Sequence, residues 1–147
     1  MNVKTALLAT LGCIIVALSG CHSEESQTVP SAEHTPEKVI QVYYFHRTAR
    51  CPSCLKIESL AHETVQTFFP VELESGAVRW HAVNVDNASA EHFVDDYELS
   101  TQTLIVAEFS GEQQIRWKNL DRVWELLDNE LDFRQYVEME IRNWLSN

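Results

Sequence analysis

Two cysteines, Cys51 and Cys54, stand where one hydrophobic pattern gives way to another. Residues 39–46, Val-Ile-Gln-Val-Tyr-Tyr-Phe-His, are rich in β-branched and aromatic side chains, which predicts a buried strand. From Pro52 onward the apolar residues recur at helical spacing, and proline suits the first turn of a helix because its missing N–H is not needed there. The cysteine pair is therefore expected where a strand ends and a helix begins.

The later patterns extend this start into a β-α-β-α-β-β-α order. Strands are expected over 77–85, 103–109 and 113–118, and helices over 52–69, 89–98 and 121–145. The last two strands flank Ser110-Gly111-Glu112, a short turn that predicts an antiparallel hairpin. Because Asp128 and Asn129 interrupt the final helical pattern, that helix is expected to be either long or broken in two.

A β-α-β unit followed by a hairpin and a helix predicts an α/β sandwich. The four strands would form one mixed sheet with helices on both faces, in a single domain over residues 38–147. A chain of 147 residues is long enough for one such core. The formal net charge of −11 and the lack of any Lys/Arg run in the sequence argue against a nucleic-acid partner.

The N-terminus, residues 1–20, has the pattern of a secretory signal. Lys4 precedes an apolar run over 6–18 that is too short for a membrane span. The run ends in Leu-Ser-Gly-Cys21, which resembles the bacterial lipoprotein box. That resemblance implies cleavage before Cys21 and a diacylglycerol on its sulfur. Residues 21–37 are polar and contain proline, so we expect a flexible lipidated tether.

The lipid predicts a location on the extracytoplasmic side of a bacterial membrane. Several acyl chains hold a protein on a bilayer durably, whereas one chain alone binds marginally. His22 follows Cys21 in place of the Asp that favours inner-membrane retention, so the expectation leans toward the periplasmic side of the outer membrane. An ordinary cleaved signal with a free Cys21 is the alternative.

Cys51-Pro52-Ser53-Cys54 resembles the Cys-Pro-x-Cys of glutaredoxins and periplasmic disulfide oxidoreductases, proteins with a thioredoxin-like fold. The strings VYYFHRTARCPSC, STQTLIV and LDRVWELL resemble a narrower group, the thioredoxin-fold nitrophenyl compound nitroreductase subunits found with arsenic-resistance genes. The resemblance covers most of residues 38–145. It implies a thioredoxin-like three-layer sandwich that passes electrons in a nitroaromatic or arsenic-related reduction. The sequence has no flavin motif, so this chain alone is not expected to transfer hydride.

The spacing of the pair has a chemical reason. A cysteine at a helix N-terminus is stabilised as the thiolate, which is the form that attacks disulfides. Cys51 is therefore the expected nucleophile, and Cys54, one turn deeper, is the expected resolving thiol. The predicted activity is that of a thiol–disulfide oxidoreductase that uses a redox-active disulfide and no other cofactor. Outside the cytoplasm it would need a membrane protein as thiol reductant or oxidant.

Further candidate site residues flank the pair or precede the third strand. Thioredoxins place a cis-proline before that strand, whereas this chain has Ser-Thr101-Gln102-Thr. The candidates for tuning the thiol pKa or contacting substrate are His46, Arg47, Arg50, Pro52, Ser53, Thr101 and Gln102.

Three other uses of the pair remain open from the sequence. The pair could be a static disulfide, although closing so short a loop stabilises little. Two thiolates would also suit a soft metal or arsenic(III), which predicts a binding protein, although no full set of metal ligands is expected. In the third alternative the chain is a catalytically inactive interaction module, in which the pair carries no chemistry.

Overall fold

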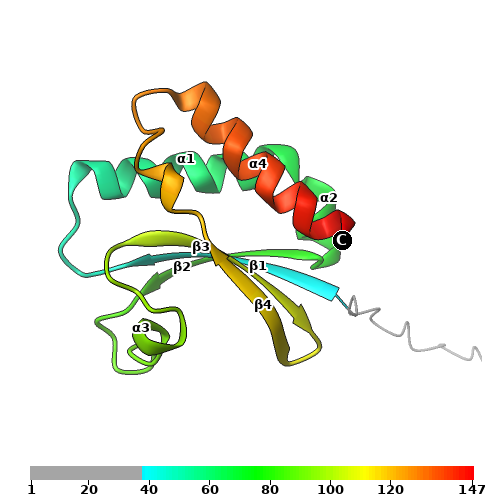
Figure 1. Ribbon diagram of the computed structural model, residues 1–147, viewed down its shortest axis with the longest axis horizontal. Helices are drawn as coiled ribbons and strands as arrows, with labels where there is room; N and C mark the ends of the chain where they lie inside the picture. The colour runs from blue at the N-terminus through cyan, green and yellow to red at the C-terminus, as the bar shows by residue number, and fades with distance from the viewer. Residues whose placement is uncertain (1–37) are drawn as a thin grey trace, which may run out of the picture. The chain divides into compact units, whose positions relative to one another are not determined.

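The computed structural model describes residues 38–147, which fold into an alternation of strands and helices (Figure 1). In order these are β1 (Lys38–His46), α1 (Pro52–Phe68), α2 (Pro70–Ser75), β2 (Val78–Asn84), α3 (Phe93–Asp96), β3 (Thr103–Ser110), β4 (Gln113–Asn119), the 3-10 turn η1 (Asp121–Val123) and α4 (Glu130–Ser146). None of the helices described is long and apolar enough to cross a membrane. The predicted signal, tether and lipidation at Cys21 lie outside the described residues.

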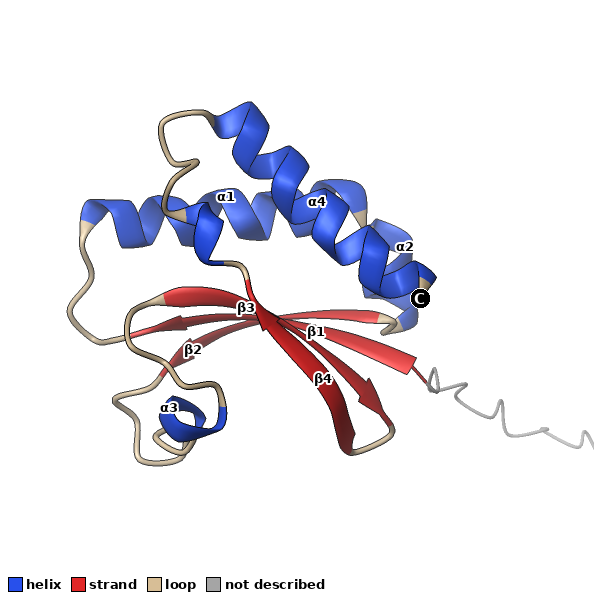
Figure 2. Cartoon of the chain, viewed as in Figure 1, coloured by secondary structure: helices blue, strands red, loops and turns tan. Residues whose placement is uncertain are grey.

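The four strands form one mixed sheet in the order β2-β1-β3-β4 (Figure 2). β1 runs parallel to β2 and antiparallel to β3, and β3 is antiparallel to β4. The predicted mixed four-stranded sheet and its terminal hairpin are thus confirmed. Gly111 takes a left-handed φ of 59° in the hairpin turn, a conformation that glycine adopts at no steric cost.

Helices cover the sheet unequally, with α1, α2 and α4 on one face and α3 on the other (Figure 1). Alternate side chains of β1 point to the two opposite faces of the sheet. Val42 and Tyr44 join the larger core with α1 and α4, whereas Phe45 packs with Tyr97 near α3. The fold is therefore an α/β sandwich, as predicted, in which β1 is central and buried on both faces.

Two predicted helices are shorter in the structure. The helix expected over 89–98 is only the single turn α3. Residues 89–92 form turns before it, and Glu98 adopts a positive φ of 50° after it. Residues 121–128 form η1 and turns, so only the second half of the expected C-terminal helix is α-helical. The break falls as predicted, because the Asn129 side chain accepts a hydrogen bond from the backbone N–H of Asp132 and caps α4.

Candidate functional site

The candidate site is the disulfide between Cys51 and Cys54, in the segment where β1 gives way to α1. Their Cα atoms are 5.1 Å apart. Cys51 is the N-cap residue of α1, and its Sγ accepts a hydrogen bond from the backbone N–H of Cys54 at 3.1 Å. Pro52 occupies the first helical position. The pair thus lies between the end of a central strand and the start of a helix, as the sequence predicts.

The two cysteines differ in access to solvent. Cys51 is exposed, as are Pro52 and Ser53, whereas Cys54 is only 2% exposed and belongs to the core. Because an incoming disulfide or thiol must reach the sulfur that it attacks, Cys51 is the member of the pair open to a partner. Cys54 is placed to act on Cys51 from inside the protein.

Tyr44 supports the buried end of the pair from β1. Its hydroxyl donates a hydrogen bond of 2.7 Å to the carbonyl oxygen of Cys54, and its side chain is fully buried. Burial raises the pKa of Tyr44 above its ordinary value, although the nearby Arg50 opposes this. The phenol therefore stays a neutral donor at physiological pH and ties the first turn of α1 to the sheet.

Arg50 is directed into the protein and forms an ion pair with Glu58 of α1. Its guanidinium carbon lies 5.7 Å from the centre of the Tyr44 ring. The Arg50 and Glu58 side chains are 21% and 26% exposed, so the pair is largely shielded from water. The Nε atom of Arg50 is buried and has no hydrogen-bond partner among the described residues.

The loop between β1 and Cys51 is hydrogen-bonded to the segment that follows β2. Asp86 accepts hydrogen bonds from the Arg47 guanidinium at 3.0 Å and from the Thr48 backbone N–H at 2.8 Å. These bonds, chiefly the one from Thr48, lower the pKa of Asp86. His46 Nδ1 lies 3.0 Å from the Arg47 carbonyl oxygen, which requires a proton on that nitrogen. The side chain of Arg47 is thus engaged by a carboxylate.

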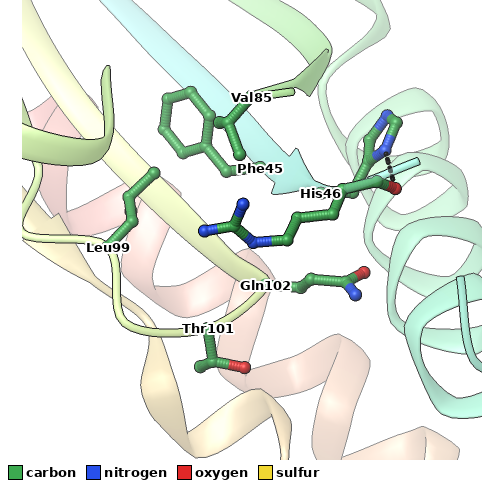
Figure 3. Close-up of a pocket in the computed structure, with 7 residues that line it drawn as sticks. Phe45, His46, Val85, Leu99, Thr101 and Gln102 are labelled. Carbon is green, nitrogen blue, oxygen red and sulfur yellow. Dashed lines mark hydrogen bonds between the residues drawn. The ribbon is translucent and has the colours of Figure 1, made fainter. Parts of the chain in front are cut away.

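The loop before β3 contacts the segment of residues 47–51 between β1 and α1, the cysteine loop. Gln102 donates a hydrogen bond of 3.3 Å to the Ala49 carbonyl oxygen, and its own backbone carbonyl accepts one of 3.0 Å from the Trp124 indole. Thr101 beside it is exposed. Figure 3 shows the hollow that forms here, close to the cysteine loop. It is lined by Phe45, His46, Arg47, Val85, Leu99, Thr101 and Gln102.

The structure brings together residues that the sequence prediction kept apart or omitted. Tyr44, Glu58 and Asp86 are not among the site residues that the sequence predicts. Glu58 carried a usable signal, because it follows Cys54 by four residues and so shares its helix face. Asp86 carried none, since its contact with Thr48 spans 38 positions of the chain.

Residues 38–147 bring no set of potential metal ligands together: no group of three or more His, Cys, Asp or Glu side chains is placed there to hold a metal ion. His62 stacks on Trp80 with ring centres 5.1 Å apart, and His81 lies 2.6 Å from the Gln41 side-chain oxygen. Both histidines are therefore occupied by packing or hydrogen bonding away from the cysteines.

Comparisons with known proteins place this chain in no family. No family model matches it, and no curated protein matches it. Among solved structures, one described as "Structure of a malarial protein" is similar at 14% identity and a TM-score of 0.37, over 63% of this chain and 98% of that one. A TM-score this low does not define a shared fold. The chemistry of the site must therefore be inferred from its own residues.

Proposed function

We propose that this chain is a thiol–disulfide oxidoreductase of thioredoxin-like fold, anchored by a lipid on Cys21 to the extracytoplasmic side of a bacterial membrane. The observation that carries the proposal is the exposed Cys51 joined to the buried Cys54 at the N-terminus of α1. The topology supports the fold assignment, because the pair follows a central strand that is parallel to β2 and antiparallel to β3.

In the reducing direction, the Cys51 thiolate attacks one sulfur of a substrate disulfide. The substrate S–S bond breaks, a mixed disulfide forms, and the released substrate thiolate takes a proton from water. Cys54, after losing its proton, attacks Sγ of Cys51 and expels the second substrate thiolate. The Cys51–Cys54 disulfide re-forms, and two electrons have passed from the pair to the substrate. The oxidising direction is the reverse of these steps.

The contacts of each sulfur suit these roles. The Cys51 thiolate would retain the hydrogen bond from the Cys54 backbone N–H and would face the positive end of the α1 dipole. Cys54 is buried, and burial favours the neutral thiol. Cys51 is therefore ionised first and attacks first, and Cys54 reacts only when the mixed disulfide brings an electrophilic sulfur next to it.

The partners are inferred from this chemistry and from the sequence resemblance. A reducing role outside the cytoplasm requires electrons from a membrane protein that carries thiols, because glutathione is scarce there. The resemblance to nitrophenyl compound nitroreductase subunits favours delivery of those electrons to a nitroaromatic or arsenic-related reduction. Thr101 and Gln102 are the proposed contacts for the incoming partner, because they lie beside the cysteine loop.

The test is a redox titration of the full chain, purified in detergent, against glutathione buffers. We expect one reversible two-electron couple in the wild type and its complete loss in Cys51→Ser. Catalysed reduction of insulin by dithiothreitol should be lost in the same variant. If the wild type instead bound arsenite stoichiometrically and turned over no disulfide, a binding protein would replace the enzyme. A mature wild-type chain whose Cys21 carries no diacylglycerol by mass spectrometry would refute the lipid anchor.

A further inference from the structure

The two arginines and the lysine closest to the cysteine pair in sequence all form ion pairs in the structure. These are Arg47 with Asp86, Arg50 with Glu58, and Lys56 with Glu130. Only the pair of Arg50 and Glu58 is well shielded, because both its side chains are less than one-third exposed. Solvent and salt screen the two more exposed pairs, so their charges have less effect on a nearby sulfur.

The shielded pair spans the first two turns of α1. Arg50 immediately precedes Cys51, and Glu58 follows Cys54 by four residues. The guanidinium lies over the ring of Tyr44, whose hydroxyl holds the Cys54 carbonyl. Both charges of the ion pair therefore lie close to the segment that carries the disulfide.

We infer that Glu58 sets the reduction potential of the pair by cancelling the charge of Arg50. This inference rests on the proposed function. Reduction places a negative charge on Cys51, whereas the disulfide is neutral. An unopposed Arg50 would favour the reduced form and make the protein more oxidising, and the Glu58 carboxylate removes that preference. The Arg50–Glu58 pair thus holds the reduction potential of Cys51–Cys54 below the value that an unopposed Arg50 would give.

Charge-removing variants should move the potential in opposite directions. Glu58→Gln leaves Arg50 unopposed, so the equilibrium constant for oxidation by glutathione disulfide should fall about five- to tenfold, the order of effect expected of one largely shielded charge beside the cysteine pair. At about 30 mV per tenfold change, the potential rises by about 20–30 mV. Arg50→Gln leaves Glu58 unopposed and should raise the constant. The double variant should return close to the wild-type value.

The peptide that holds the pair can be measured separately from every other cysteine of the chain. The full chain in detergent is equilibrated in glutathione buffers, quenched in acid, alkylated and digested with trypsin. Cleavage after Arg50 and Lys56 releases residues 51–56, which contain both site cysteines. In Arg50→Gln, cleavage after Arg47 releases residues 48–56 instead. The ratio of alkylated to disulfide-linked peptide gives the equilibrium constant.

Glu63→Gln provides the matched control, because Glu63 also lies on α1 and forms an ion pair with Arg134 at 2.6 Å. It should leave the constant within twofold of the wild type. Equal shifts in Glu58→Gln and Glu63→Gln, or shifts of the same sign in Glu58→Gln and Arg50→Gln, would overturn the inference. A wild type without any reversible couple would instead overturn the proposed function, so the two failures are distinguishable.

Discussion

Replacing Tyr44 with Phe tests whether the sheet holds the first turn of α1 in place. The change removes one hydroxyl from a fully buried side chain, together with its 2.7 Å hydrogen bond to the Cys54 carbonyl. A hydrogen bond of this kind contributes about 1 kcal/mol to the free energy of unfolding. Because Cys54 lies within α1, its carbonyl remains a helical acceptor, so the cost is one lost bond and not an orphaned polar group.

The measurement is urea-induced unfolding of the oxidised full chain, followed by tryptophan fluorescence. For a folded part of 110 residues (38–147), about 1 kcal/mol corresponds to a fall in Tm of roughly 4 °C. We expect a lower denaturation midpoint with an unchanged dependence on urea concentration, because the surface exposed on unfolding stays the same.

Tyr43→Phe is the control, since Tyr43 precedes Tyr44 in β1 and points to the opposite face of the sheet. The same atom is removed there without touching the cysteine segment. We expect a destabilisation of less than about half that of Tyr44→Phe. Equal effects at the two positions would show that the hydroxyl of Tyr44 adds nothing beyond ordinary burial, and the proposed anchoring of the helix start would be wrong.

Three further predictions concern the site and its support. Cys54→Ser should trap a mixed disulfide between Cys51 and a substrate thiol, visible as an added mass on the intact chain; rapid release of that thiol would contradict the resolving role. Because the pKa of Asp86 lies below its ordinary value of 3.8, the stability that this carboxylate contributes is present above that value and lost as pH falls through its folded-state pKa. Asp86→Asn should therefore flatten the acid side of a plot of stability against pH, and an unchanged plot would show that the contacts of Asp86 are energetically silent. Gly76→Ala should cost about 1 kcal/mol in urea unfolding, because residue 76 ends α2 at a φ of 76° that alanine adopts only with strain, and no loss would mean that the turn relaxes.

The sequence was informative where one local rule decides the structure. β1 follows from its β-branched and aromatic run, and α1 from apolar spacing together with Pro52. Local rules failed where tertiary contacts compete with helix formation. After β4, the Leu120 backbone N–H donates to the Leu104 carbonyl oxygen at 2.8 Å, and the Trp124 indole donates to the Gln102 carbonyl oxygen. These contacts hold the segment against β3 and the loop before it, so α4 begins only at Glu130.

The same limit applies to the site. The position of the cysteines was predictable, because both the strand and the helix that flank them are encoded locally. The partners of the neighbouring arginines were not predictable, since Asp86 and Arg47 are 39 positions apart in the chain. From the sequence, Arg47 and Arg50 are candidates for tuning the thiol pKa of Cys51, whereas the folded chain supplies a carboxylate to each of them. Charge counted along the sequence is therefore a poor guide to the field at the sulfur.

The indole of Trp124 gives the protein a built-in optical probe. Its N–H is bonded to the backbone of Gln102, whose side chain in turn holds the loop that leads to Cys51. Any partner that displaces that loop must disturb this chain of contacts and change the polarity around the ring. Emission from a variant that retains Trp124 and replaces the other three tryptophans with Phe would thus report docking in real time, with no dye attached.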